Sequence, residues 1–182
     1  MAGESSARSK DRIVQTMNIT TDSITTEDDF LRAVERNAGA INKVCYYYAH
    51  DAEEFTDLRQ DVLANLWAYR STFRGDSALF TWIYRISLNT CISALRRRKR
   101  RGQRVGIEAI SELMADDTDK ARMHTEMHAL IGRLSAEQKA IVLLWIDEMS
   151  YDEIAAIVGC PRNTVASRLR RIKEKLARWA DE

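Results

Sequence analysis

The chain has 182 residues, of which 45% are hydrophobic and 30% are charged. This balance is typical of a globular protein and excludes a chain that is disordered throughout. The formal net charge is only +1 at pH 7, but the charges are unevenly distributed. Eight basic residues and no acidic one lie between Arg85 and Arg104, and seven basic residues with one acidic residue lie between Arg162 and Arg178. Two separate basic patches indicate two contacts with a polyanion.

Glycine is scarce and Pro161 is the single proline, which favours an all-α fold. Uninterrupted apolar stretches stay below the ~18 residues of a membrane-spanning helix, and the N-terminus has no signal-peptide pattern. We therefore expect a cytoplasmic protein with no direct membrane insertion. Three widely spaced cysteines are typical of reduced residues that pack as small hydrophobic side chains.

The first part of the chain divides into a tail and a helical domain. Residues 1–26 are polar and have no helical period, so we expect a flexible tail. Residues 27–101 carry three successive apolar patterns with helical spacing, which predict a first small helical domain. Residues 102–122, with two glycines and an acidic stretch, are expected to form a flexible linker. The patterns are Phe30, Leu31, Val34, Ala38, Ile41 and Val44; then Leu58, Val62, Leu63, Leu66 and Trp67; then Leu79, Ile83 and Ile86.

Residues 123–182 are expected to form a second small helical domain. Ser135 to Gln138 and Ser150 to Glu153 have the spacing of capping boxes, in which two side chains satisfy each other's backbone N–H groups. Pro161 suits the first position of a helix, where the missing N–H costs nothing. These signals predict helices that begin near residues 136, 151 and 161.

The last two of these helices have the pattern of a helix-turn-helix. Gly159 suits a turn that needs a positive φ. In the second helix, Val165, Leu169, Ile172 and Leu176 form one apolar stripe, so the opposite face is exposed. That face carries side chains that can bond base edges and phosphates in a major groove, although an amphipathic helix with a solvated basic face is the alternative. The candidate residues are Arg162, Asn163, Ala166, Ser167, Arg170 and Arg171.

A second candidate surface lies in the first domain. Residues 73–82 are expected to form a turn that runs into a helix with Ser77 as the N-cap. Trp82, Arg85, Asn89 and Arg96 then follow one side of that helix. Aromatic rings that stack on bases and arginines that follow phosphates suit single-stranded DNA. The alternative for Trp82 is an ordinary place in the core.

Taken together, these segments resemble extracytoplasmic-function (ECF) sigma factors of the sigma-70 family. Residues 73–77 and 81–86, with Asn89, resemble the promoter-melting segment of that family. Residues 57–63 resemble its polymerase-binding helix. Residues 150–155 and 164–169 resemble its helix-turn-helix. The resemblance implies sigma region 2 in residues 27–101 and sigma region 4 in residues 123–182.

The resemblance also implies partners and site residues. The partners would be the RNA polymerase core, through the clamp coiled coil of the largest subunit and the flap, then promoter DNA and an anti-sigma factor. No catalysis, cofactor or metal is implied. The exposed face of the second helix of the helix-turn-helix would contact the −35 element. Ala166 stands where many members of the family have a basic residue, so the promoter sequence of a relative cannot be transferred to this chain. Polymerase would bind Asp57, Gln60 and Asp61, and the −10 element would bind Phe73, Arg74, Phe80, Trp82, Arg85, Asn89, Arg96, Arg97, Arg98 and Arg100.

Two other classes of protein fit part of the pattern. A helix-turn-helix regulator that acts without being a polymerase subunit would share the C-terminal motif, but it has no need of the basic-aromatic segment. An enzyme or metal protein is suggested only by His124 and His128, which lie four residues apart with Glu126 between them. Two ligands without a third are a weak zinc signal.

Overall fold

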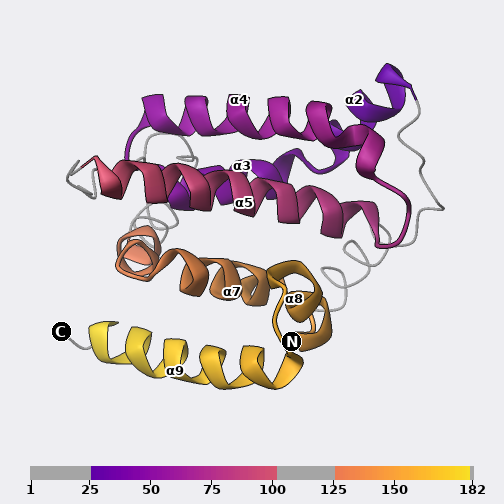
Figure 1. Cartoon of the computed structure of the whole chain (residues 1–182). Coiled ribbons are helices and arrows are strands. Elements are labelled where there is room, and N and C mark those ends of the chain that lie inside the picture. Colours follow the sequence, from indigo (N-terminus) through magenta and orange to yellow (C-terminus); the bar gives the residue numbers. More distant parts are fainter. Residues whose placement is uncertain (1–25, 102–125, 181–182) are drawn as a thin grey trace, which may run out of the picture.

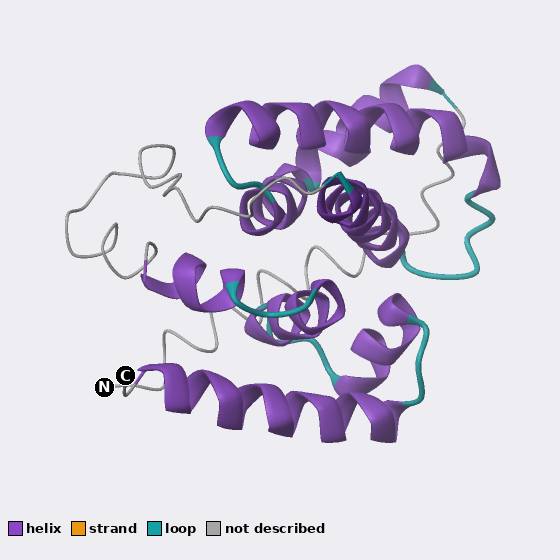
Figure 2. Cartoon of the chain, turned by 60° about the vertical axis from the view of Figure 1, so that its left-hand side comes forward, coloured by secondary structure: helices purple, strands orange, loops and turns teal. Residues whose placement is uncertain are grey.

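The computed structural model describes residues 26–101 and 126–180, and within these ranges the chain is helical and has no strand. The all-α prediction is therefore confirmed. The N-terminal domain contains α2 (Glu27–Arg36), α3 (Ala38–Tyr48), α4 (Ala52–Tyr69), the 3-10 turn η1 (Arg70–Thr72) and α5 (Leu79–Arg100). The C-terminal domain contains a helical segment over residues 126–132, then α7 (Ala136–Ile146), α8 (Tyr151–Val158) and α9 (Arg162–Ala180). Figures 1 and 2 show the two domains as two layers. The expected flexibility of the tail and the linker concerns residues outside the described ranges, apart from Thr26.

Thr26 belongs to the first helix rather than to the tail. Its side chain accepts the backbone N–H of Asp29, and the Asp29 carboxylate accepts the backbone N–H of Thr26 at 3.1 Å, which completes a capping box. The first apolar pattern is then divided at Asn37, where α2 ends and α3 begins. Within α2 the buried residues are Phe30 and Ala33, and Leu31 lies away from the core with an exposed fraction of 54%.

Helices α3, α4 and α5 enclose the core of the N-terminal domain. Buried side chains include Val44 of α3, Val62 and Leu66 of α4, and Ile83 of α5. Trp67, which the second apolar pattern included, is 38% exposed; its ring lies against Phe30 and beneath the guanidinium of Arg70. Helix α5 begins after Ala78, whose side chain makes no cap, so the prediction of Ser77 as the N-cap was wrong.

The helix starts of the C-terminal domain follow the sequence signals closely. Both capping boxes form, and α7 and α8 begin directly after Ser135 and Ser150. Gly159 ends α8 with a φ of 71°, as the turn requires. Helix α9 begins at Arg162, one residue after the predicted position of Pro161. Local hydrogen bonds therefore determine where these helices begin.

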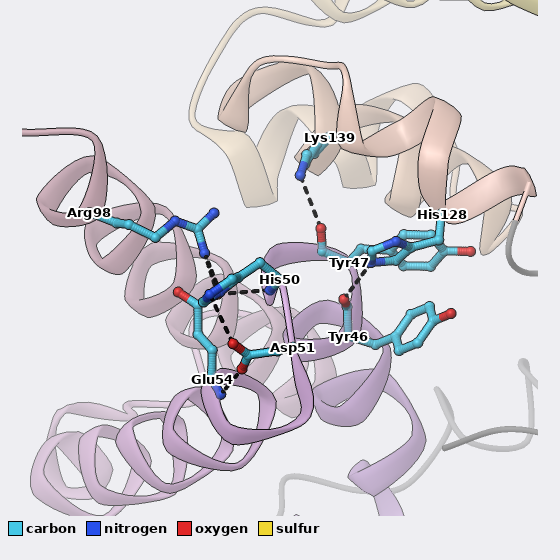
Figure 3. A network of polar contacts seen from close by, with 8 residues as sticks. All are labelled: Tyr46, Tyr47, His50, Asp51, Glu54, Arg98, His128 and Lys139. Atoms are coloured by element: carbon cyan, nitrogen blue, oxygen red, sulfur yellow. Dashed lines mark hydrogen bonds and ion pairs between the residues drawn. The ribbon is translucent and has the colours of Figure 1, made fainter. Parts of the chain in front are cut away.

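The two domains are packed against each other. Helix α5 contacts α7 and α8, and α3 contacts α7. The Tyr48 hydroxyl donates to the carbonyl of Ala136 at 2.6 Å, and the Lys139 ammonium donates to the carbonyl of Tyr47 at 3.1 Å. His128 donates through Nε2 to the carbonyl of Tyr46 at 3.0 Å (Figure 3). These polar bonds lie within a hydrophobic cluster that continues from one domain into the other, and side chains of the C-terminal domain donate to backbone carbonyls at the end of α3.

Two glycine substitutions should change stability in opposite directions. At Gly159 an alanine would meet no neighbouring atom, but the left-handed backbone should cost about 1 kcal/mol of unfolding free energy. Gly39 lies in α3 without a positive φ and also has open space around it. Gly39→Ala should therefore stabilise the protein by about 0.5–1 kcal/mol. Chemical denaturation of both variants measures the difference, and equal shifts would contradict the assigned turn.

Candidate polymerase and nucleic-acid interface

An acidic face of α4 carries the three residues predicted to bind polymerase. Asp57, Gln60 and Asp61 are all exposed, because Leu58 and Val62 face the core between them. Asp57 and Asp61 line an open cleft of about 450 Å³ between α4 and the end of α5. Asp61 also lies 3.7 Å from the guanidinium of Arg97, and both side chains are 55% exposed. Such an exposed ion pair is weak and can exchange for another partner.

The basic end of α5 divides into exposed and buried arginines. Arg96, Arg97 and Arg100 are exposed. Arg98 is 7% exposed, and its guanidinium forms an ion pair with the Glu54 carboxylate of α4 (Figure 3). The same carboxylate accepts the backbone N–H of His50 at 2.8 Å. The structure thus places Arg98 inside the domain, where it joins α5 to α4, and removes it from the exposed basic surface.

The aromatic residues of the loop and the start of α5 are half-buried. The rings of Phe73 and Trp82 lie 5.5 Å apart, and the Phe80 ring lies 5.4 Å from the ring of Tyr84. Trp82 packs against the hydrophobic core, and part of its surface is still accessible. Its contact with DNA stays a prediction. Arg74 is exposed in the loop beside these rings.

Asn89 lies in a different part of the same face. It is exposed and lines an open cleft of about 470 Å³ together with Asn65, Tyr69 and Arg97. Phe73 and Phe80 are not among the residues that line this cleft. Tyr69 is 53% exposed. Sequence analysis missed it, although an aromatic residue at the end of an amphipathic helix, beyond the last apolar position of its pattern, was the available signal.

The predicted recognition face of α9, made of Arg162, Asn163, Ala166, Ser167, Arg170 and Arg171, is arranged as the apolar pattern predicts. Val165, Leu169 and Ile172 are buried, while the opposite face is exposed and Ala166 is half-buried. Two of its arginines have exposed acidic partners: Arg162 lies 3.4 Å from Asp152, and Arg170 lies 3.3 Å from Glu174. Asn163, Ser167 and Arg171 are exposed on the same face.

Two of the predicted −10 residues contact the C-terminal domain. The guanidinium of Arg85 donates to the carbonyl of Ala156 in α8. The guanidinium of Arg96 lies 2.7 Å from the Glu137 carboxylate of α7, and this hydrogen bond holds the pKa of Glu137 below its ordinary value. Both arginines are exposed, but their guanidinium groups are already bonded to groups of the C-terminal domain.

The histidine pattern is not supported as a metal site by the part of the chain that the structure describes. His124 lies outside the described residues. His128 is 4% exposed, stacks on Tyr47 and bonds the carbonyl of Tyr46. Burial lowers the pKa of His128, which keeps the imidazole neutral. Within residues 26–101 and 126–180, no cluster of three or more His, Cys, Asp or Glu side chains has an arrangement that could hold a metal ion.

Comparison with known proteins finds two family models that match successive parts of the chain. The family model described as Sigma-70 region 2 matches residues 33–101, and that described as Sigma-70, region 4 matches residues 124–176. The RNA polymerase sigma-H factor of Pseudomonas aeruginosa is 31% identical over 71% of this chain and 74% of that protein. The ECF RNA polymerase sigma-E factor of Escherichia coli K12 is 31% identical over 66% of this chain and 70% of that protein.

Two solved structures are also similar. The sigma factor RpoE of Bartonella quintana, in complex with the anti-sigma factor NepR, matches with a TM-score of 0.71 and 26% identity over 84% of this chain and 97% of that chain. CnrH, in complex with the cytosolic domain of CnrY, has a TM-score of 0.65 and 23% identity, and it covers 94% of this chain and 97% of that chain.

The fold and these matches define an RNA polymerase subunit of the sigma class. The chain belongs to the ECF group of the sigma-70 family. As a sigma factor it binds core RNA polymerase and directs promoter-specific transcription initiation at −35 and −10 elements, and sigma factors are non-catalytic regulatory subunits. The alternative of an independent helix-turn-helix regulator is not favoured. Among the helices of the described residues, none has both the length and the apolar character to cross a membrane.

Arg98 and Arg100 should respond differently to replacement. Arg98→Ala removes the partner of the Glu54 carboxylate, of which 18% is exposed, so unfolding free energy should fall by about 1–3 kcal/mol. Arg100→Ala removes an exposed side chain and should change stability by less than about 0.5 kcal/mol. Urea denaturation of the two variants makes the comparison. Equal stability of both would contradict the buried role of Arg98.

Proposed function

We propose that three surfaces of this chain divide the work of promoter-specific initiation. The acidic face of α4, with Asp57, Gln60 and Asp61, docks on the basic clamp coiled coil of the polymerase largest subunit. The adjoining face of α5 holds the melted −10 strand, and the recognition face of α9 reads the −35 element. One observation carries this proposal. The acidic face of α4 adjoins the cleft lined by Tyr69 and Asn89 on one domain, while the recognition face of α9 lies exposed on the other domain.

The −10 surface combines the chemistry that a single strand requires. Tyr69 offers an exposed ring for a base to stack on, and the amides of Asn65 and Asn89 can bond its edge. Phe73, Arg74, Phe80 and Trp82 would contact the adjacent bases. Arg97 and Arg100 would contact phosphates, while Arg85 and Arg96 would do so once they leave the C-terminal domain.

The remaining parts of the proposal concern boundaries and partners. We assign sigma region 2 to residues 27–101 and sigma region 4 to residues 123–182, joined by residues 102–122. The factor would act in the cytoplasm, where polymerase is found, without catalysis of its own. The similar RpoE structure is of a complex with an anti-sigma factor, which supports an anti-sigma factor as a regulator of this chain as well.

Run-off transcription tests the proposal as a whole. Purified core polymerase is incubated with the full chain on a pool of genomic DNA fragments. New transcripts that need both components should start downstream of a shared pair of sequence elements. DNA binding by the chain without core polymerase, together with no dependent transcripts, would favour an independent regulator instead.

Charge reversal on the acidic face should weaken polymerase binding. Asp57 is exposed within the cleft, so Asp57→Lys should leave folding intact and replace attraction to a basic surface with repulsion. Affinity for core polymerase should fall at least about tenfold, a change of ~1.4 kcal/mol. The control is Glu35→Lys, an exposed acid on α2. An equal loss of affinity in both variants would show that the effect depends on the net charge of the chain and not on the acidic face of α4.

Arg170 is predicted to read a base of the −35 element. Arg170→Ala should reduce discrimination between the correct element and a mutated one by about 1–3 kcal/mol. Arg178, near the C-terminal end of α9, provides the control because it lies farther than Arg170 from the N-terminal part of the helix, through which recognition helices contact bases. If Arg170→Ala lowers affinity equally for all sequences and reduces the salt dependence, Arg170 contacts phosphate instead.

Tyr69 and Asn89 are predicted to act in melting rather than in binding. Tyr69→Ala and Asn89→Ala should each leave core binding nearly unchanged, because both side chains are exposed. Loss of a stacked base costs about 1–3 kcal/mol, so open complexes should form at least several-fold less. Permanganate footprinting of unpaired thymines measures this. If the Tyr69→Ala variant opens the promoter normally, base capture is assigned to the Phe73–Phe80 loop instead.

A further inference from the structure

The cleft of about 470 Å³ between α4 and α5 has two walls of different chemistry. Asp61 and Asn65 follow each other at one-turn spacing on α4, and Asn89, Ser93 and Arg97 have the same spacing on α5. Side chains at this spacing share one face of a helix, so each set forms one wall of the cleft. The carboxylate on the α4 wall only accepts hydrogen bonds, and the guanidinium on the α5 wall only donates them.

The amide of Asn65 is held in one direction by a chain of two hydrogen bonds. Its Nδ2 donates to Oγ1 of Thr90 at 3.0 Å, and that hydroxyl donates its single proton to the carbonyl of Ile86 at 2.9 Å. Thr90 is 8% exposed. With its proton used, the Thr90 oxygen can only accept from Asn65, and a reversed amide would place two acceptors against each other. The Oδ1 atom of Asn65 is therefore turned away from Thr90, and it adds a second fixed acceptor to the α4 wall.

A neighbouring cleft of about 560 Å³ has the chemistry that a phosphate requires. Its lining residues are Ser93, Arg96, Arg97, Lys99 and Arg100, four of which are cations. Ser93 and Arg97 line both clefts, so the two clefts adjoin along α5. A phosphate is favoured among the cations and disfavoured beside the carboxylate of the α4 wall. A single strand that follows this face therefore places its backbone in the basic cleft and a base between α4 and α5.

The four bases differ in what they offer to two acceptors. Adenine, cytosine and guanine each carry an exocyclic amino group that donates hydrogen bonds, whereas thymine has carbonyl oxygens in the corresponding positions. An amino group can donate to Oδ1 of Asn65 and to the Asp61 carboxylate, while a carbonyl oxygen there is repelled by both. The guanidinium of Arg97 and the hydroxyl of Ser93 can donate to the acceptors of the same base. The cleft therefore favours a base that carries an amino group.

We propose that Asn65 selects a base with an exocyclic amino group over thymine at one position of the melted −10 strand, and that Thr90 is the positioning residue that fixes the direction of the Asn65 amide. The inference rests on the proposed −10 surface and names the class of base that it takes. Stacking on Tyr69 adds affinity without choosing a base, because every base has a π-face. The choice between bases is made by the hydrogen bonds of the α4 wall.

The test uses holoenzyme assembled from core polymerase and the full chain, on bubble templates of a promoter found by run-off transcription. In a bubble the strand is already unpaired, so a base change does not alter the energy of melting. Each position of the non-template −10 strand carries, in turn, three matched pairs of bases. Adenine and purine, and likewise guanine and hypoxanthine, differ by one amino group. The third pair is 5-methylcytosine and thymine, which share the methyl group and differ in their hydrogen-bonding edge.

The wild-type holoenzyme should bind the amino-bearing member of a pair about 5- to 100-fold more tightly at one position, and the pair with the largest ratio identifies the base. Asn65→Ala should abolish this preference. Thr90→Val should abolish it as well, because the similar shape is kept while the amide is free to reverse. Thr90→Ser keeps a hydroxyl and should retain the preference.

Ser87→Ala is the matched control. The Ser87 hydroxyl makes the equivalent bond in the same helix, to the carbonyl of Ile83 at 2.9 Å, and Ser87 is not among the residues that line the cleft. This variant should keep the preference of the wild-type holoenzyme. A loss of preference in Ser87→Ala equal to that in Thr90→Val would overturn the role of Thr90, because it would trace the effect to a general change in α5.

The ratio within each pair separates base selection from damage to the fold, since damage lowers affinity for both members alike. Equal affinity for both members of every pair, with open complexes that form normally, overturns the inference and leaves the proposed function in place. A full preference in Thr90→Val or in Asn65→Ala also overturns it. If the wild-type holoenzyme forms no open complex on any template, the proposed function and the inference fail together.

Discussion

Helix α5 is the constraint on which the rest of the structure depends. One side of this helix packs against α3 and α4 and completes the core of the N-terminal domain, and another side contacts α7 and α8. The sides that remain carry Asn89 and the exposed arginines. A single helix therefore holds one domain together, presents its DNA surface and receives the other domain. Few of its positions can change without affecting at least one of these roles.

The local features of the fold could be predicted from the sequence. Capping boxes depend on residues three positions apart, and the turn at Gly159 depends on one residue that tolerates a positive φ. The apolar stripe of α9 has a clear helical period, so its buried and exposed faces followed directly. These predictions needed no knowledge of what lies elsewhere in the chain.

Predictions that depended on distant neighbours were less secure. Arg98 stands in a run of basic residues, and nothing in that run shows that one of them pairs with Glu54 from another helix. Leu31 and Trp67 fit apolar patterns but are exposed, because the first and second patterns do not show which of their positions face the other helices. The cleft around Asn89 includes Tyr69 because α4 and α5 lie side by side. The contact between the two domains left no signal in the sequence, because several of its bonds use backbone carbonyls that every residue has, and others join side chains far apart in the chain.

The pair of Glu54 and Arg98 has a consequence for the evolution of this protein. Replacing either residue alone leaves a charge without its partner inside the domain, and such an intermediate is expected to be selected against. The two positions lie 44 residues apart in the chain. Among descendants of this sequence they should change together, either to another pair of opposite charges or to two apolar side chains. The exposed arginines on either side are free of this coupling and can vary with the promoter.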